Sequence, residues 1–393
     1  MLPDRLHTGD GALADDLLHQ SHLVARRITT WVADEDVQGA FPVRSFEALA
    51  DSGLMTAPLP RALGGNGLGT EPHALTLLLR VLANVGRGSL PVGRIYEGHV
   101  NALILVCTYG TQAQQEQAAH DAHNGKIFGV WNTGAGDDVQ MTRTPTGALL
   151  EGAKVFCSGA GYVDRPLVNG PIDGEGWQMA LVPMERFDLP IDLKWWTAEG
   201  MRATRSGRVD FSGVELPDDW LIGTEDDYHR EPHFNGGSVR FAAVQLGGAQ
   251  ALFDACRDHL LSLGRTGDAH QQMRLGEVAV ALETGYLWLN GAARLLESSA
   301  SNADKVAYAQ MTRTAIERAC LDVMERVDRS VGARGLLAPS PIERIGRDLR
   351  LYLRQPATDA VVTAAGAHAA EHGDNRALGS DAVGEVPCMR EVQ

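Results

Sequence analysis

Cysteine is scarce in this chain of 393 residues, and no two cysteines lie close together. The five cysteines are odd in number and include no Cys-x-x-Cys pair: Cys107, Cys157, Cys256, Cys320 and Cys388. This spacing excludes a disulfide framework and a zinc site built on paired cysteines. We therefore expect reduced thiols and no metal site.

Long apolar runs are also lacking. None reaches the length that a bilayer-spanning helix needs. The first residues, from Met1 to His7, lack the basic segment and apolar run of a secretory signal. We therefore expect a cytoplasmic protein with no membrane partner.

Basic and aromatic residues are both in the minority. The chain has 35 Lys and Arg against 50 Asp and Glu, a net charge of −15. This acidity argues against a nucleic-acid partner, because phosphate backbones attract basic surfaces. Aromatic residues make up only 6% of the chain, which favours helices over a β-sandwich. The length predicts two or three domains.

The spacing of apolar residues divides the chain into three parts. Steps of three and four residues predict helices in the first and last parts, and short apolar runs between turn residues predict a small sheet or barrel in the middle. Long helices joined by short loops at the end predict an up-down bundle. The helices are expected at 11–32, 43–52, 71–86, 97–108, from Thr111 onward, 236–263, 275–298 and 306–331. The domains are expected at 1–126 (helical), 127–223 (β) and 236–370 (helical bundle), followed by a flexible tail at 371–393.

One stretch, residues 328–359, reverses the sign of the local charge. Seven arginines and three acidic residues lie between Arg326 and Arg354. Arginines and a Gly-rich loop suit an anion such as the pyrophosphate of a dinucleotide. The alternative is a solvated helix with local ion pairs, such as Arg344 or Arg347 with Asp348.

Six short motifs occur in an order that resembles the acyl-CoA dehydrogenase family of FAD flavoproteins. The resemblance spans nearly the whole chain. The motifs are Gly53-Leu…Pro60…Gly64-Gly-Asn-Gly, Tyr109-Gly-Thr-Gln, the segment from Val130 to Asp138, Gly152-Ala-Lys-Val-Phe-Cys-Ser158, Gly200-Met-Arg…Pro217…Gly223, and Gly332-Ala-Arg-Gly335…Glu343-Arg-Ile-Gly-Arg-Asp348.

The resemblance implies an α+β fold, mostly α, with an N-terminal helical domain, a middle β-barrel and a C-terminal four-helix bundle. It also implies a homodimer or homotetramer, with FAD between the barrel and the bundle and part of its site on a neighbouring subunit. In the barrel, Val130 and Trp131 would flank the pyrimidine side of the flavin, and Phe156 and Ser158 would lie against the isoalloxazine. The alternative for Ser158 is an ordinary strand hydroxyl.

The bundle would supply the other half of the FAD site. Arg265 would bind the pyrophosphate of the partner's FAD, although it could instead be a cation at a helix C-terminus. Gly332, Ala333 and Gly335 would lie over the adenine half, and Thr358 would also contact the cofactor. The anion interpretation of residues 328–359 is the one that this resemblance favours.

The resemblance also exposes differences at the reacting centre. Dehydrogenation of an acyl thioester needs a carboxylate to take the α-proton, and Pro356 and Val239 occupy the two places where family members carry it. Gly237 replaces an acidic residue that helps to hold acyl-CoA in some members, whereas Arg240 is kept at a substrate-binding place. Asp359 is the nearest carboxylate, and it could be a base or a helix N-terminal charge.

Isolated histidines offer no replacement for the base, because a lone histidine usually has a packing role. They are His99, His270 and His368.

Three functions stay open. The first is an FAD-dependent oxidoreductase of a small molecule, a thioester included, whose reaction has moved away from acyl-CoA dehydrogenation. The second is a flavin monooxygenase, and the third is a non-catalytic descendant.

Overall fold

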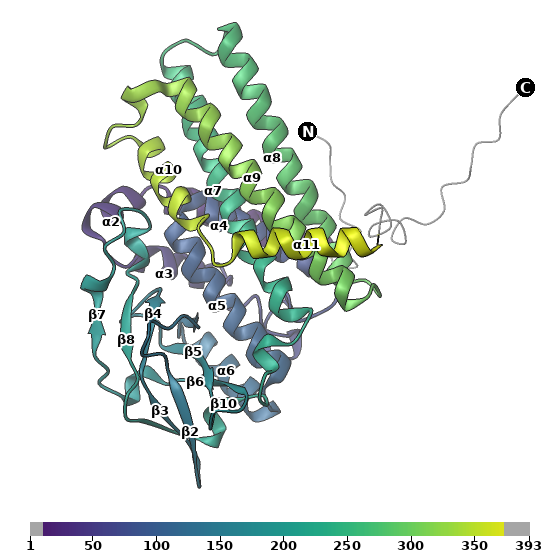
Figure 1. The fold of residues 1–393 in the computed structure, drawn as a ribbon. Helices are drawn as coiled ribbons and strands as arrows, with labels where there is room; N and C mark the ends of the chain where they lie inside the picture. Colours follow the sequence, from purple (N-terminus) through teal and green to yellow (C-terminus); the bar gives the residue numbers. More distant parts are fainter. Residues whose placement is uncertain (1–10, 373–393) are drawn as a thin grey trace, which may run out of the picture.

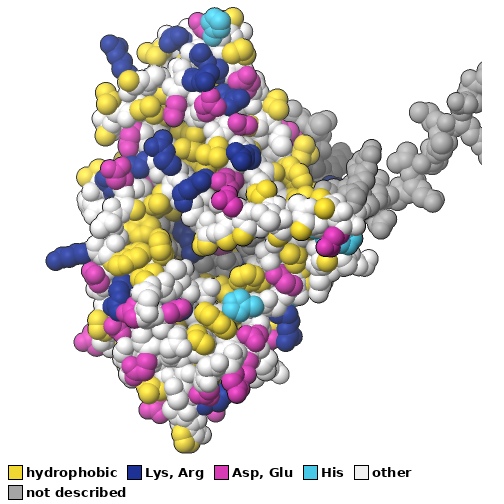
Figure 2. Space-filling view, in the orientation of Figure 1, with side chains coloured by type: hydrophobic (Ala, Val, Ile, Leu, Met, Phe, Trp, Pro, Cys, Tyr) yellow, Lys and Arg dark blue, Asp and Glu magenta, His cyan; other side chains and the backbone are white. Residues whose placement is uncertain are grey.

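The computed structural model describes residues 11–372, so residues 373–393 of the tail expected at 371–393, with Cys388, lie outside the described residues. Long helices form the upper part of the molecule, and the sheets lie in the lower part with further helices beside them (Figure 1). Figure 2 shows the same orientation with all side chains. The helices are α1 (Gly11–Ile28), α2 (Val32–Gln38), α3 (Val43–Asp51), α4 (Leu75–Gly88), α5 (Leu90–Tyr109), α6 (Gln112–His123), α7 (His233–Ser262), α8 (Ala269–Leu296), α9 (Asn302–Gly335), α10 (Pro341–Tyr352) and α11 (Thr358–His372). The strands are β1 (Phe128–Trp131), β2 (Gln140–Thr144), β3 (Gly147–Glu151), β4 (Ala153–Cys157), β5 (Arg165–Pro171), β6 (Trp177–Leu181), β7 (Ile191–Asp192), β8 (Gly207–Asp210), β9 (Val214–Pro217) and β10 (Leu221–Ile222).

Helix ends are set by local side chains. Thr111 caps α6 as predicted: its hydroxyl accepts from the backbone N–H of Gln114, whose side chain accepts from the N–H of Thr111. By contrast, α5 begins at Leu90, earlier than the predicted residue 97. Ser89 caps it, and Pro91 is tolerated because the first turn has no internal partner for its N–H.

The middle strands form three small sheets and no closed barrel among the described residues. The strand orders are β1-β5-β6-β10, β2-β3-β9 and β4-β8-β7. The β1–β5 pair is parallel and the other pairs are antiparallel. Single bridges outside the named strands, Asp138–Ala153 and Met141–Ile172, are too short to continue the pairing around a barrel.

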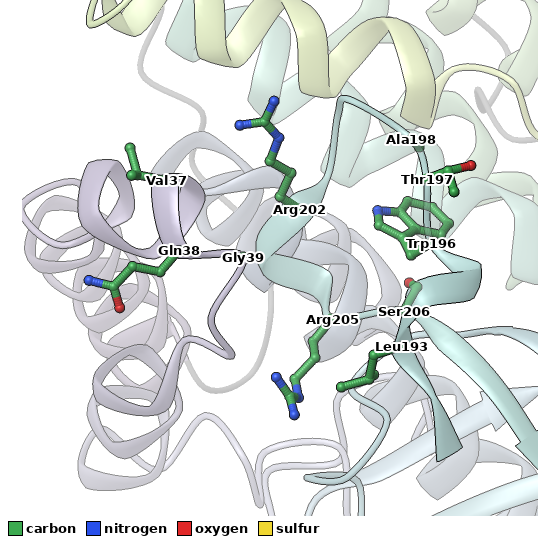
Figure 3. Close-up of a pocket in the computed structure, with 10 residues that line it drawn as sticks. All are labelled: Val37, Gln38, Gly39, Leu193, Trp196, Thr197, Ala198, Arg202, Arg205 and Ser206. Carbon is green, nitrogen blue, oxygen red and sulfur yellow. The ribbon is translucent and has the colours of Figure 1, made fainter. Parts of the chain in front are cut away.

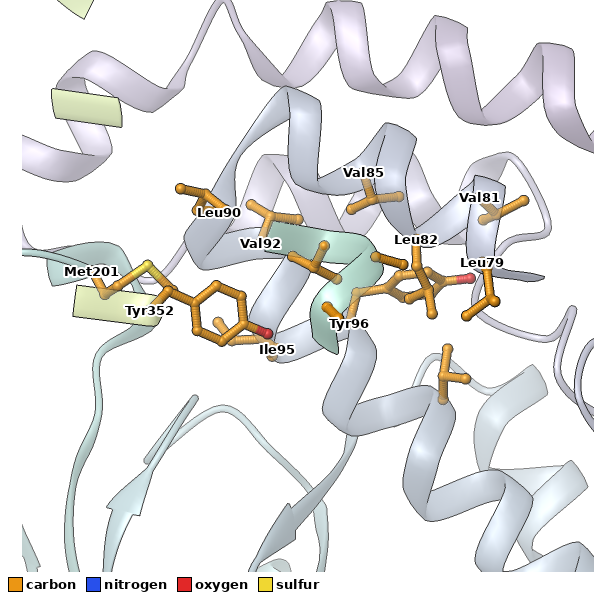
Figure 4. Packing of buried hydrophobic residues seen from close by; sticks show 14 of the residues in the cluster. Leu79, Val81, Leu82, Val85, Leu90, Val92, Ile95, Tyr96, Met201 and Tyr352 are labelled. Carbon is orange, nitrogen blue, oxygen red and sulfur yellow. The ribbon is translucent and has the colours of Figure 1, made fainter. Parts of the chain in front are cut away.

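Glycines let α7 lie directly against α4. A Cβ on Gly247 of α7 would lie 1.9 Å from the carbonyl oxygen of Ala83, and a Cβ on Gly86 of α4 would lie 2.4 Å from that of Val244. These helices belong to a continuous apolar core that also includes Tyr96 (Figure 4). The contact joins the first helical part of the chain to the long helices of the last part.

The long helices end at a break that the sequence partly predicts. The expected loop at 332–341 begins as a kink inside α9, where Gly332 has φ 63° and ψ −173°. α10 then packs back toward the sheets and α11 lies across α9 (Figure 1). α11 continues to His372, one residue beyond the predicted start of the tail at 371.

Candidate functional site

The ends of β1 and β4 bring two predicted flavin residues together. The indole Nε1 of Trp131 donates a hydrogen bond of 3.1 Å to the carbonyl oxygen of Ser158. Trp131 is buried, and its ring centroid lies 6.3 Å from that of Phe211. Its ring therefore belongs to the core, and the half-buried Val130 is the side chain that can meet a ligand here.

Phe156 lies at an irregularity in β4. Its φ of 56° is in the left-handed region, which non-glycine residues seldom adopt. The pairing of β4 with β8 shifts register between Lys154 and Cys157. Phe156 is 49% exposed, and its ring centroid lies 4.8 Å from that of Trp195 and 5.9 Å from that of Trp196. The bulge thus turns an aromatic ring outward, where a planar ligand can pack.

A cavity of about 420 Å³ lies beside these rings (Figure 3). Trp196 and Ser206 line it, and the Ser206 hydroxyl is 3.2 Å from that of Ser158. Two buried donors of lining residues, Trp196 Nε1 and Arg205 Nε, have no hydrogen-bond partner among the described residues. An unsatisfied buried donor costs about 1–3 kcal/mol. A ligand that brings acceptors, as the ribityl and phosphate oxygens of a flavin do, fits this cavity.

The other predicted cofactor residues lie far from this wall. Arg265 is exposed in the turn between α7 and α8. That turn and the end of α9, with Gly332, Ala333 and Gly335, lie at the opposite end of the long helices from the sheets (Figure 1). The Gln271 side chain joins the beginning of α8 to the carbonyl of Ser330 at 3.3 Å. One chain therefore brings Arg265 and the Gly332 segment to the same end of the bundle, but does not bring either to Ser158.

Several arginines of residues 328–359 are engaged by acidic side chains. Arg347 Nη2 lies 2.7 Å from Asp36 Oδ2 on α2, and Nη1 lies 3.6 Å from Asp348 Oδ1. Arg329 pairs with Glu325 at 2.8 Å, and Arg354 pairs with Glu317 at 2.5 Å. For Arg347 the predicted ion pair with Asp348 is confirmed. For these arginines, ion pairing within the chain explains the reversal of charge.

The two base positions carry no proton acceptor. Val239 is buried in α7. Pro356 is exposed, and its carbonyl accepts from Arg313 Nη2 at 2.6 Å. Thr358 is half-buried at the beginning of α11, and Asp359 follows it with an exposed side chain. Asp359 thus occupies the first turn of an outer helix.

A buried polar cluster that sequence reasoning missed lies between α5 and α7. Arg94 Nη1 lies 2.7 Å from Glu97 Oε2. The amide of Asn101 donates to Glu97, and its oxygen accepts from Arg240 Nε, so that the predicted substrate residue Arg240 is linked to Arg94. The sequence feature that could have indicated this cluster is the pair of opposite charges, Arg94 and Glu97, inside an apolar helix. We name these residues, Arg94, Glu97, Asn101 and Arg240, the α5–α7 cluster.

His99 has the packing role that the sequence predicts. Its Nδ1 accepts from the backbone N–H of Phe128 at 3.1 Å, so Nε2 carries the proton and donates to the carbonyl of Met55 at 2.7 Å. Burial lowers the pKa of His99 to about 4. It is therefore a neutral core histidine. Within residues 11–372, no group of three His, Cys, Asp or Glu residues could hold a metal ion, and no helix is both apolar and long enough to cross a membrane.

Two family profiles match the chain. "Acyl-CoA dehydrogenase, N-terminal domain" matches residues 20–126, and "Acyl-CoA dehydrogenase, C-terminal domain" matches residues 239–354. The chain belongs to the acyl-CoA dehydrogenase family. The predicted family is confirmed, as is the mostly helical fold with sheets in its middle.

Within this family, the chain is similar to proteins of two kinds. A dibenzothiophene monooxygenase of Mycolicibacterium goodii is 26% identical over 89% of this chain and 92% of its own. FMN-bound TdsC of Paenibacillus sp. A11-2 has a TM-score of 0.80 at 20% identity, over 89% of this chain and 96% of that one. Butyryl-CoA dehydrogenase of Megasphaera elsdenii has a TM-score of 0.81 at 16% identity, over 93% and 99%. The two structures share the fold of this member of the acyl-CoA dehydrogenase family.

Proposed function

We propose that this chain is a flavin-dependent oxidoreductase that acts on a small molecule as a monooxygenase. One observation carries the choice: Val239 and Pro356 stand at both places where a dehydrogenase of this family needs a carboxylate. Neither side chain can accept a proton. Oxygenation by a reduced flavin needs no such base. The similarity to dibenzothiophene monooxygenase supports the same choice.

The residues of one chain can hold the reactive half of a flavin. Phe156 offers an exposed ring for packing, and the Ser158 and Ser206 hydroxyls lie beside it. Trp196 Nε1 and Arg205 Nε offer donors that lack partners among residues 11–372. A bound flavin supplies two-electron transfer and, once reduced, reaction with oxygen. The chain's own residues orient it and keep water away from its buried side.

FAD is the flavin that we propose, with Arg265 and the segment from Gly332 to Gly335 acting on the pyrophosphate and adenine of a partner subunit's cofactor. This arrangement requires at least a homodimer. FMN is the alternative, because it is the flavin bound in TdsC. Chromatography of the flavin released from purified protein distinguishes the two.

The deciding experiment begins with flavin content. Purified protein should be yellow, or should bind added FAD or FMN; a protein that binds neither would end the proposal. The flavin-loaded protein is then mixed without oxygen with butyryl-CoA, octanoyl-CoA and palmitoyl-CoA. We expect the flavin to stay oxidised, and, after chemical reduction, to be reoxidised rapidly by dissolved oxygen.

Acyl-CoA dehydrogenation remains the second candidate because Arg240 is kept at the substrate place. Bleaching of the flavin by any of the three thioesters would favour that reaction. Slow reoxidation by oxygen would favour it as well.

A further inference from the structure

The α5–α7 cluster contains more positive than negative charge. Arg94, Glu97 and Asn101 occupy successive turns of one face of α5, and Arg240 reaches them from α7. Two guanidinium groups therefore share one carboxylate. Gly237 leaves room for the Arg240 guanidinium on the α7 side, because a Cβ there would lie only 3.1 Å from Arg240 Nη2.

The other titratable groups that interact with the cluster are two phenols and the imidazole of His233, which begins α7, interacts with Arg240 and has its pKa lowered mainly by burial. Tyr228 precedes α7, and Tyr352 ends α10; both interact with the charges of Glu97 and Arg94. Burial raises the pKa of Tyr228 to about 12 and also raises the pKa of Tyr352. Both are neutral at physiological pH. Glu97 is thus the acidic side chain that acts on both guanidinium groups, and one positive charge is left over.

Tyr352 supplies a second, independent observation. It is 4% exposed, and its hydroxyl has no hydrogen-bond partner among the described residues. In Figure 4 its ring extends from α10 toward α5, and its hydroxyl interacts with the charges of Glu97 and Arg94 on that helix. A buried hydroxyl without a partner is rare in folded proteins, because it loses its bonds to water. The Tyr352 hydroxyl therefore has no acceptor for its proton among the described residues.

Arg94 can reach a ligand although its partner cannot. The Arg94 side chain is 27% exposed, whereas that of Glu97 is 3% exposed. A Cβ on Gly98 would lie 3.6 Å from Arg94 Nη1 and 3.8 Å from the backbone nitrogen of Val130. The guanidinium therefore lies where α5 meets β1, next to the residue proposed to flank the flavin.

We propose that the substrate carries an oxyanion, such as a carboxylate or sulfinate, which accepts hydrogen bonds from Arg94 and from the hydroxyl of Tyr352. The anion neutralises the surplus charge of the cluster and supplies the acceptor that Tyr352 lacks. A guanidinium and a hydroxyl together match the two oxygens of such a group. This inference rests on the proposed function, because it names the substrate class of the same site.

Calorimetry with paired probes tests the charge preference. Benzoate and acetate are titrated into flavin-loaded and flavin-free protein, with benzamide and acetamide as uncharged counterparts. We expect each anion to bind at least roughly tenfold more tightly than its amide. Equal affinities, or no binding of either anion up to roughly 10 mM, would overturn the proposal.

The variant Tyr352→Phe tests the hydroxyl. It removes a group without a partner, so the melting temperature of the ligand-free protein should not fall. Its affinity for benzoate should drop by roughly tenfold, the effect of one hydrogen bond to a charged group, and its affinity for benzamide should not change. Tyr286→Phe, in α8 and away from the cluster, is the matched control and should leave both affinities unchanged.

Unchanged benzoate binding by Tyr352→Phe would refute the proposal. Failure of the anion-site proposal is distinguishable from failure of the proposed function. Protein that binds no flavin but prefers the anions would lose the proposed function and keep the anion site. Flavin-loaded protein that is reoxidised by oxygen but binds anions no better than amides would keep the proposed function and lose the anion site.

Discussion

The Asp348 carboxylate accepts a hydrogen bond of 2.6 Å from the backbone N–H of Met201. Asp348 lies in α10, and Met201 lies in the loop that leads to β8. The neighbouring Arg347 donates to the carbonyl of Glu199 at 2.5 Å and to Asp36 of α2 at 2.7 Å. Two adjacent residues of one helix therefore hold the sheets and the first helices against the bundle.

Asp348 should make stability depend on pH. Burial raises its pKa to about 6, so the folded state binds its proton more tightly than the unfolded state does. This contribution favours folding below pH 4 and is lost as pH rises through 6. In Asp348→Asn it is absent. The free energy of unfolding of the variant minus that of the natural chain should rise by up to about 3 kcal/mol between pH 4 and pH 7. Urea unfolding across that range measures it, and a difference independent of pH would contradict the assignment.

The contact of α4 with α7 should tolerate no side chain at Gly247. A Cβ there would lie 1.9 Å from the carbonyl oxygen of Ala83, and neither backbone can yield without separating the helices. Gly247→Ala should lower the free energy of unfolding by about 1–3 kcal/mol or more. Gly276→Ala is the matched control, because nothing lies within 4 Å of its Cβ in α8. It should stabilise by about 0.5–1 kcal/mol. Changes of the same sign in both variants would argue against this account.

Trp196→Phe should separate flavin binding from folding. The indole Nε1 has no partner among the described residues, so its loss removes no hydrogen bond from the flavin-free protein. The melting temperature without flavin should change little. Flavin affinity, measured by fluorescence titration, should fall by roughly tenfold. Leu193→Val is the control, because it shortens a side chain that lines the same cavity without removing a hydrogen-bond donor. Equal losses in both variants would mean that packing, not the indole donor, holds the cofactor.

Arg265→Ala tests the proposed contact between subunits. Arg265 is exposed in the turn after α7, so its removal should leave the chain folded. If it binds the pyrophosphate of a partner's FAD, the fraction of protein purified with FAD should fall several-fold. Arg257→Ala, an exposed arginine paired with Asp258 at 3.0 Å, should retain its FAD. The same FAD content in both variants would mean that Arg265 is only a cation at a helix C-terminus and does not bind the pyrophosphate.

Local patterns in the sequence predicted much of the fold. The three- and four-residue steps predict the long helices, and Thr111 predicts the beginning of α6. The prediction was wrong at the beginning of α5, which lies at Leu90 and not at residue 97. There the cap of Ser89 and the position of Pro91 in the first turn are compatible with a helix. The barrel implied by the resemblance is three sheets, because strand pairing depends on distant partners.

The candidate site was less predictable. The sequence indicated Ser158, Phe156 and Arg265 by resemblance, but it gave no sign that Trp196 Nε1 would be left without a partner. It also suggested a phosphate site near Arg347, whose ion pair with Asp36 joins residues far apart in the chain. Burial and long-range pairing are consequences of packing, and local periodicity does not contain them.

By itself, the sequence determined the family, the alternation of helices and strands, and the absence of a carboxylate at positions 239 and 356. These features depend on residue type and local spacing. Only the tertiary structure decided which charges are neutralised. Arg347 found acidic partners on α2 and within α10, whereas Arg94 and Arg240 share the single carboxylate of Glu97. The physical reason is that a charge buried by folding depends on whatever partners the packed chain brings within reach.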